Sequence, residues 1–529
     1  MKLQSLGVML DCSRNAVMSV EALKKYITTL NKMGYNQFQL YTEDTYEVEG
    51  EPFFGYMRGR YSAEELSDLD EFCRGIGVEL VPNIQTLAHL NAIVRWGDYQ
   101  NIVDCNDILL AGEPRTYELV ENMLKSLRKV FSSDKIHIGM DEAHMLGKGK
   151  YFDINGPKDR SEILLEHLNR VCELCDKYGF KPMMWSDMFY RLANGGEYYA
   201  KNTSFGDKIK AMIPDNLTLV YWDYYSVHKN HYDAMFKGHK ALCNRVAFAG
   251  GAWKWSGFTP HNAFSIKCTK AAIASCTEHG IKDVFITAWG DDGAEASPLS
   301  VLPTLCYAAC IAQGITTLAD IKAKFFDYVG VSYDDFMLLD LPDKLDKQLL
   351  TNPSKYLLYN DCFMGLFDNI VGPEDGKKYA SYARRLKNAA KRAGEYAYLF
   401  EAAAKLCSAL SIKADLGVRT HKAYADRDTQ ALKSVIADYK KLIKRLESFY
   451  AAYKTQWFNE NKPHGFDIQD IRLGGLIMRV KSCKERLEEL VAGKPDTIPE
   501  LEEKQLSLSD KHYNFNSWGK SVSANVVTW

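Results

Sequence analysis

The chain has 529 residues, a formal net charge of -2 and 12% aromatic residues. This length favours two or more domains, and the balanced charge gives no electrostatic reason to expect nucleic acid or a membrane as a partner. The first residues lack the apolar segment of a signal peptide, and no apolar run is long enough to span a bilayer. The 13 cysteines are therefore expected to be reduced thiols in a cytoplasmic protein.

Short apolar segments alternate with amphipathic helical segments through the first part of the chain. The predicted strands are residues 6–11, 37–42, 79–84, 135–140, 182–187, 217–223, 245–253 and 283–290. Strands that alternate with helices imply right-handed parallel crossovers. Eight such units predict a (β/α)8 TIM barrel over residues 1–330, with a doubly wound open sheet as the alternative.

The rest of the chain, residues 331–529, has a different character. It is rich in Ala, Leu, Lys and Glu at helical spacing, most clearly in residues 377–416 and 429–458. This pattern predicts an α-helical C-terminal domain. Its last residues, 514–529, include several aromatic side chains, and we expect this tail to dock on another surface.

Polar side chains and tryptophans follow the predicted strands at their carboxyl ends. In chain order they are Asp11, Arg14, Glu43, Asp44, His89, Asp141, Glu142, Trp185, Asp187, Tyr221, Asp223, Tyr224, Trp253, Trp289 and Asp291. In a barrel of this kind the carboxyl ends of all strands meet at one rim, where active sites are built. We therefore expect these side chains to line one pocket.

Asp141 and Glu142 are the most informative of these residues. Successive side chains of an extended segment diverge, so the two carboxylates could flank one bound group from different angles. Partial burial and a neighbouring anion both raise the pKa of a carboxyl group, which suits a general acid. The tryptophans offer apolar faces to a sugar ring, and Arg14, Asp223 and Asp291 offer partners for its hydroxyl groups. This set favours glycoside hydrolysis.

Other interpretations of these residues stay open. An isolated Asp-Glu pair commonly marks a helix N-terminus, where acids suit the helix dipole. Tryptophans at strand ends can also pack a barrel against its helices. Cys172 and Cys175 have metal-ligand spacing, but they lie in an amphipathic helix and no second pair completes a zinc set. We expect neither a metal nor another cofactor.

Several segments resemble glycoside hydrolase family 20, the β-N-acetylhexosaminidases, which are (β/α)8 barrels. HIGMDEAH, residues 137–144, is similar to the family's His-x-Gly-Gly-Asp-Glu motif. Further similar segments, in the family's order, are LDCSRN (10–15), NKMGYNQFQLYTED (31–44), LAHLNAIVRWG (87–97), YWD (221–223) and AWGDD (288–292).

The resemblance implies a retaining mechanism in which the substrate supplies the nucleophile. Glu142 would protonate the glycosidic oxygen and later deprotonate water. Asp141 would hold the N–H of the substrate's 2-acetamido group, whose carbonyl attacks the anomeric carbon to form an oxazolinium ion. Tyr221 would hydrogen-bond the acetamide oxygen, and Trp185 and Trp289 would enclose its methyl group.

The resemblance also implies how the sugar hydroxyls are held. Arg14 would bind the 3- and 4-hydroxyls, Asp291 the 4-hydroxyl and the 6-hydroxyl, and Asp223 the 6-hydroxyl. His89 would lie at the substrate and His137 behind the acids, and Asp44 would hold one of these two histidines. The expected substrate is a glycan or glycoside with a terminal N-acetylhexosamine, and the long helices are compatible with a homodimer.

The sequence departs from the family pattern at a few positions. Met140 replaces the second glycine of the motif, and Asp291 is shorter than the glutamate it matches, so Asp292 is an alternative. Tyr224 or Tyr225 could take the place of Tyr221. The third tryptophan of the acetamide pocket has three candidates, which are Trp222, Trp253 and Trp255.

Two other kinds of function are kept beside the exo-acting hexosaminidase. One is a carbohydrate-binding barrel without catalysis, although such a protein would be expected to lose one of the two acids. The other is a different barrel hydrolase, acting on O-linked GlcNAc of proteins or using a metal ion.

Overall fold

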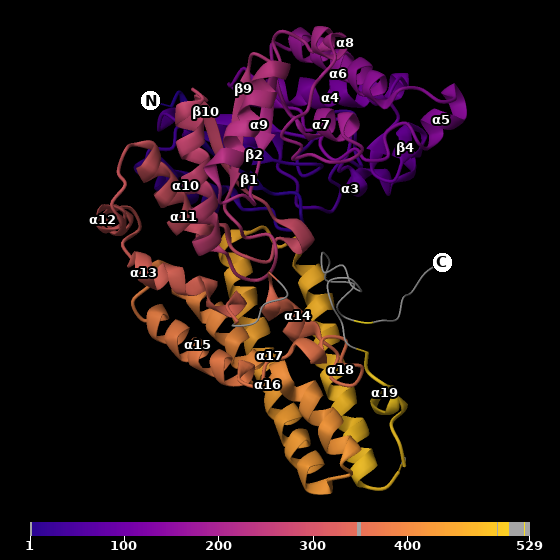
Figure 1. Cartoon of the computed structure of the whole chain (residues 1–529), viewed down its shortest axis with the longest axis vertical. Coiled ribbons are helices and arrows are strands. Elements are labelled where there is room, and N and C mark those ends of the chain that lie inside the picture. The colour runs from indigo at the N-terminus through magenta and orange to yellow at the C-terminus, as the bar shows by residue number, and fades with distance from the viewer. Residues whose placement is uncertain (1–2, 346–350, 495, 507–522, 524–529) are drawn as a thin grey trace. The chain divides into compact units, whose positions relative to one another are not determined.

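The computed structural model describes residues 3–345, 351–494, 496–506 and 523 (Figure 1). The chain divides into a barrel unit, residues up to 253 with 263–289 and 304–324, and a helical unit, residues 254–262, 290–303 and from 325 onward. The helical unit thus takes in residues 254–262, 290–303 and 325–330, which the prediction placed in the barrel domain. The predicted aromatic tail, 514–529, lies outside the described residues except for Ser523.

Eight parallel strands close into a barrel in the first unit, which confirms the predicted fold class. They are β1 (Ser5–Asp11), β2 (Gln37–Tyr41), β3 (Glu79–Asn83), β6 (Lys135–His137), β7 (Lys181–Trp185), β8 (Thr218–Trp222), β9 (Val246–Gly251) and β10 (Asp283–Ala288). Around the barrel their order is β1-β10-β9-β8-β7-β6-β3-β2. Leu10 lies beside Leu40 of β2 and Ala288 of β10, so the residues that follow these strands emerge at the same rim.

The connections between the strands are mostly helical, as the alternating pattern predicts. The helices are α1 (Val20–Met33), α2 (Ala63–Gly75), α3 (Asn91–Val94), α4 (Pro114–Val130), α5 (Lys150–Asn155), α6 (Arg160–Lys177), α7 (Asp187–Ala193), α8 (Asp207–Met212), α9 (Lys229–Leu242), α10 (Asn262–Glu278), α11 (Leu302–Ala312) and α12 (Leu318–Val329). A short antiparallel pair, β4 (Val103–Cys105) and β5 (Ile108–Leu109), lies in the connection after β3 and was not predicted.

Helix α1 illustrates how the local sequence forms these elements. The Ser19 side chain accepts a hydrogen bond from the Ala22 N–H, which satisfies one of the free donors of the first turn. Gly34 ends the helix at φ 102°, a conformation that favours glycine. The buried side chains recur at intervals of three and four residues and form one apolar face; they are Leu23, Tyr26, Ile27, Leu30 and Met33.

The helical unit is built from long helices that pack side by side (Figure 1). Its helices are α13 (Tyr333–Phe336), α14 (Pro353–Tyr359), α15 (Asp375–Ala390), α16 (Ala397–Ala425), α17 (Thr429–Glu460), α18 (Phe466–Val491) and α19 (Pro499–Glu502). Between α16 and α17 the connection is only three residues long, which makes these two helices an antiparallel hairpin. Among the described residues, no helix has both the length and the apolar character needed to cross a bilayer.

A buried acid, Glu460, ends α17 in the helical unit. Its Oε1 atom accepts hydrogen bonds from the Ser297 hydroxyl at 2.6 Å and the Tyr398 hydroxyl at 2.8 Å. Burial raises the pKa of Glu460 to about 7, although both hydroxyls stabilise the charged form. The folded protein therefore keeps this side chain protonated at pH values where the unfolded chain ionises it.

We expect Glu460→Gln to remove part of the pH dependence of stability. The folded pKa is raised, so this residue makes the free energy of unfolding fall as pH rises from about 4.5 to about 7, by roughly 3 kcal/mol in total. Chemical denaturation at pH 5 and pH 8 measures the effect, because the variant should lose less stability than the wild type between these values. An identical change in both proteins would contradict the raised pKa.

Candidate active site

The loop after β6 presents Asp141 and Glu142 through an unusual backbone conformation. Gly139, Met140 and Glu142 have φ angles of 72°, 69° and 52°, all in the left-handed region. A Cβ atom on Gly139 would lie 2.1 Å from the Gln85 side-chain oxygen, so this position requires glycine. Met140, which replaces a glycine of the family motif, is fully buried in the same strained conformation.

Gln85 holds this loop in place and fixes Asp141. Its side-chain oxygen accepts the Met140 N–H at 3.1 Å, and its side-chain nitrogen donates to Asp141 Oδ1 at 2.7 Å. The Asp141 side chain is 12% exposed, whereas the Glu142 side chain is 41% exposed. The two neighbouring acids therefore differ in environment: Asp141 is held by hydrogen bonds within the rim, whereas Glu142 is accessible to solvent.

His89 lies between the two acids. Its Nε2 atom is 3.3 Å from Asp141 Oδ2 and 3.8 Å from Glu142 Oε2. Burial is the largest single influence and would lower the pKa of His89, but the charge of Asp141, the hydrogen bond to it and the charge of Glu43 together outweigh burial and raise the pKa to about 10. Burial would likewise raise the pKa of Asp141, but His89 and Gln85 lower it to about 2. Asp141 is thus an anion, and His89 a cation, at neutral pH.

A second acid, Asp187, supports the loop from the start of α7. Its Oδ2 atom accepts the Glu142 N–H at 3.1 Å and a hydrogen bond from Arg191 Nε at 3.0 Å. Arg191 also places Nη2 3.5 Å from Glu142 Oε1. Burial and the nearby charge of Asp141 raise the pKa of Asp187 to about 7, although Arg191 opposes this shift.

Arg14 lies at another part of the rim and is paired with Glu43. Arg14 Nη2 is 3.0 Å from Glu43 Oε1, and the Tyr41 hydroxyl donates to the same oxygen at 3.1 Å. Burial raises the pKa of Glu43 to about 7, although Arg14 lowers it. Tyr41 also accepts a hydrogen bond from Gln85 at 3.0 Å, so one polar network runs from Arg14 to the acid pair.

Asp44 and His137, both expected as supporting residues, make different kinds of contact. Asp44 does not hold a histidine: its carboxylate pairs with Arg58 at 3.2 Å, and His89 pairs with Asp141 instead. His137 does lie behind the acids, where its Nδ1 atom accepts the Gly139 N–H at 3.1 Å. Burial lowers the pKa of His137 to about 3, so this ring is neutral.

Aromatic side chains gather beside the acid pair. The Trp185 and Trp289 rings are 5.9 Å apart, and Tyr41 packs edge-on against Trp289 at 4.7 Å. Trp289 Nε1 donates to the Tyr224 hydroxyl at 3.0 Å. Trp253 Nε1 donates to the Tyr224 backbone carbonyl at 2.7 Å and so fixes the position of that residue.

Tyr221 and Asp223 do not contact this cluster. The Tyr221 ring packs on His239 of α9 at 4.7 Å, and its hydroxyl donates to Asp223 Oδ2 at 2.8 Å. Asp223 also binds His231 Nε2 at 2.8 Å and the Tyr225 N–H at 2.9 Å. Both side chains belong to the packing between β8 and α9, because alternate residues of a strand face opposite sides of the sheet.

The segment after β10 carries the last predicted residue, Asp291, which begins a 3-10 turn, Asp291–Gly293. Its alternative, Asp292, has φ 56° and binds Lys355 at 2.9 Å and Arg472 at 3.4 Å. Both cations also bind the buried Glu295. Asp292 therefore serves the packing of the helical unit.

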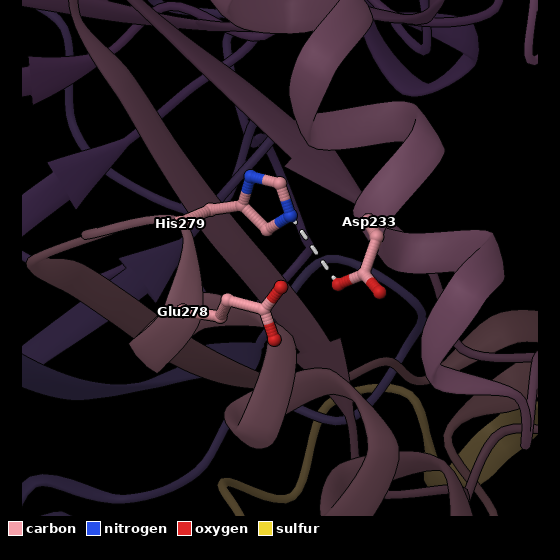
Figure 2. A group of neighbouring side chains, drawn as sticks. All are labelled: Asp233, Glu278 and His279. Carbon is pink, nitrogen blue, oxygen red and sulfur yellow. Dashed lines mark ion pairs between the residues drawn. The ribbon is translucent and has the colours of Figure 1, made fainter.

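Among the described residues, one group of three side chains has metal-ligand spacing: Asp233, Glu278 and His279 (Figure 2). His279 Nε2 is 3.3 Å from Asp233 Oδ1. The Lys229 ammonium lies 2.8 Å from Asp233 Oδ2 and 2.6 Å from Glu278 Oε2. One ammonium thus already pairs with both carboxylates, and the group is an ion-pair network between α9 and α10.

Sequence reasoning placed Glu43 and Asp187 at the rim without giving them a role, and it did not name Gln85 or Arg191. Glu43 and Asp187 stood at predicted strand ends, which was a usable signal. Gln85 follows the third predicted strand, but an amide there carries no distinctive pattern. Arg191 lies inside α7 and could be recognised only through its contacts in the folded protein.

Two family models match this chain. The glycosyl hydrolase family 20 catalytic domain matches residues 6–262, and the glycoside hydrolase 20C C-terminal domain matches residues 334–517. The chain belongs to glycoside hydrolase family 20. The residues matched by the catalytic-domain model include the acid pair at the rim of the barrel.

Individual relatives are distant. Beta-hexosaminidase 1 of Arabidopsis thaliana is 21% identical over 150 residues, which cover 26% of this chain and 27% of that protein. Hexosaminidase D of Homo sapiens is 20% identical over 344 residues, covering 60% and 68%. The chain thus spans about a quarter of the first of these relatives and about two thirds of the second.

Two solved structures are also similar to parts of this chain. A GH20 exo-β-N-acetylglucosaminidase from Vibrio harveyi is 14% identical with a TM-score of 0.47, covering 64% of this chain and 58% of that one. Another, described as a β-N-acetylhexosaminidase, is 15% identical with a TM-score of 0.48, covering 65% and 79%.

Proposed function

We propose that the chain is an exo-acting retaining β-N-acetylhexosaminidase that removes terminal β-linked GlcNAc or GalNAc from the non-reducing end of a glycan or glycoside. The observation that carries this proposal is the contrast between the two neighbouring acids. Asp141 is clamped as an anion by His89 and Gln85, whereas Glu142 beside it is accessible. Substrate-assisted hydrolysis requires both kinds of acid: an anion that stabilises the positively charged intermediate, and an accessible acid that exchanges a proton with the glycosidic oxygen.

In the proposed first step, the acetamido carbonyl oxygen of the substrate attacks the anomeric carbon. The bond from that carbon to the glycosidic oxygen breaks, and Glu142 gives its proton to the departing oxygen. Asp141 accepts a hydrogen bond from the acetamide N–H and stabilises the positive charge of the oxazolinium ion. In the second step water attacks the anomeric carbon from the leaving-group side, the bond from that carbon to the acetamide oxygen breaks, and Glu142 takes a proton from the water, so the product keeps the β configuration.

The surrounding residues would position the sugar. Trp185 and Trp289 would enclose the acetamide methyl group, and the Tyr224 hydroxyl would donate to the acetamide oxygen in place of Tyr221. Arg14 would bind the 3- and 4-hydroxyls of the ring.

Hydrolysis of 4-nitrophenyl β-N-acetylglucosaminide and its galacto isomer tests the proposal. The matched control is 4-nitrophenyl β-glucoside, which lacks the acetamide and should not be cleaved at a measurable rate. Proton NMR of the first product should show the β anomer. Equal cleavage of the glucoside, or an α anomer as first product, would contradict the mechanism. Binding of GlcNAc without any hydrolysis would instead support a carbohydrate-binding barrel.

A comparison of two tyrosines tests the revised acetamide contact. We expect Tyr224→Phe to lower kcat by about a hundredfold, because one preorganised donor to the developing charge is lost. Tyr221→Phe should leave kcat within about twofold and instead cost about 1 kcal/mol of stability, since it removes a donor to the buried Asp223. Steady-state kinetics and thermal unfolding separate the two effects. The reverse pattern would restore Tyr221 to the site.

A cytoplasmic location and a homodimer belong to the same proposal. All thirteen cysteines are free, and eleven of them are buried, which suits a reducing compartment. Light scattering coupled to size exclusion would measure the oligomeric state.

A further inference from the structure

We infer a binding subsite for the sugar on the leaving-group side of the scissile bond, formed by three aromatic side chains on neighbouring rim loops. Phe53 and Tyr56 come from the loop after β2, and Trp96 from the loop after β3. The inference rests on the proposed function and adds the part of the substrate that it leaves open. We call Phe53, Tyr56 and Trp96 the aromatic platform.

The three rings of the platform pack on one another and remain accessible. Ring centroids are 5.3 Å apart for Phe53 and Trp96, 5.7 Å for Tyr56 and Trp96, and 5.8 Å for Phe53 and Tyr56. Tyr56 is 41% exposed, its neighbour Met57 is 73% exposed, and the other two rings are half-buried. Large rings usually lie in a core, so a packed group of three that reaches the surface suggests a binding function.

The loop that carries Phe53 and Tyr56 is held in a defined conformation. Gly55 has φ 67°, and a Cβ atom there would lie 2.1 Å from the Asp44 carbonyl oxygen. Arg58 binds the Asp44 carboxylate at 3.2 Å and the Ser13 carbonyl oxygen. Arg60 donates to the Pro52 carbonyl oxygen at 3.1 Å. The platform is therefore preorganised, which lowers the entropy cost of binding.

The platform is connected to the catalytic residues on both sides. Asp44, which anchors its first loop, directly follows Glu43, the partner of Arg14. On the other side, His89 lies 3.8 Å from Glu142 and begins the loop that contains α3 and then Trp96. In the barrel order β3 lies next to β6 and β2 next to β3, so the loops that carry the platform emerge at the rim beside the loop that carries Glu142.

The chemistry of the platform fits a pyranose ring. Glu142 protonates the oxygen that joins the terminal sugar to the next residue, so that next residue leaves the pocket on the side of the acid. Aromatic faces bind the apolar C–H face of a sugar, and Tyr56 adds a hydroxyl group. The Arg95 guanidinium lies 5.4 Å from the Trp96 ring and offers donors to sugar hydroxyls.

Two substrates that differ only in the leaving group test this subsite. Tri-N-acetylchitotriose presents a sugar to the platform, whereas methyl β-N-acetylglucosaminide presents none. Trp96→Ala and Tyr56→Ala should each raise KM for the trisaccharide by about fivefold to twentyfold and leave kcat/KM for the methyl glycoside within about twofold. Phe326→Ala, which removes a ring that is 58% exposed on α12, is the matched control and should change neither.

The outcomes separate the subsite from the proposed function. Unchanged trisaccharide kinetics in both folded platform variants would overturn the subsite and leave the hexosaminidase activity standing. Equal losses on both substrates would also overturn it, since they would mean a general effect on the barrel. If the wild type cleaves neither substrate, the proposed function fails first. Should Trp96→Ala unfold, Tyr56→Ala keeps the test valid because its ring lies at the surface.

Discussion

Glu142→Gln is expected to lower kcat on a methyl or disaccharide substrate by about a thousandfold, within the range known for general acids. The amide has nearly the same size and can still contact His89 and Arg191, but it has no proton to give to the glycosidic oxygen. The accessible position of Glu142 means that the fold should tolerate this change. Thermal unfolding at a single pH would check that stability is preserved.

The leaving group gives this prediction a sharper form. The 2,4-dinitrophenolate leaving group departs without protonation. In the variant, the rate of the cleavage step should therefore fall far less for the 2,4-dinitrophenyl glycoside than for the methyl glycoside. The matched control is Glu173→Gln, which changes an exposed acid on α6 and should leave both rates unaltered. If both substrates lost activity equally, Glu142 would act by some means other than proton transfer. Full activity would remove it from the mechanism.

Asp141→Asn is the second change with a large expected effect. The anion that stabilises the oxazolinium charge is lost, and kcat should fall by about a hundredfold to a thousandfold. The acetamide N–H would still meet an oxygen, so KM should change much less than kcat. Steady-state kinetics on 4-nitrophenyl β-N-acetylglucosaminide measure both parameters. A larger effect on KM than on kcat would indicate that Asp141 serves ground-state binding.

The same variant should change the pH dependence of stability. The folded pKa of His89 is raised to about 10. Its stabilising contribution to the free energy of unfolding is therefore complete below about pH 6.5 and is lost as pH rises through 10. The folded pKa of Asp141 is lowered to about 2, so its contribution is present above about 4 and is lost as pH falls through 2. The stability difference between wild type and variant should therefore be largest near pH 5–6 and smaller at pH 10. A difference independent of pH would argue against the ion pair.

Local sequence patterns determined the barrel and the position of the acid pair. Strand and helix periods depend on neighbouring residues along the chain, and parallel strands bring their carboxyl ends to one rim. For this reason Arg14, His89, Asp141 and Glu142 could be named before their contacts were known, and the structure places the two acids within 4 Å of His89.

Only the tertiary structure decided which side chains face the site. Tyr221 and Tyr224 stand three residues apart in one segment, and the first packs on α9 whereas the second meets Trp289. The partners of Asp141, such as Gln85, come from another strand end, and no local pattern marks such a pairing. Side-chain direction and burial arise from contacts between distant parts of the chain, which a sequence period does not contain.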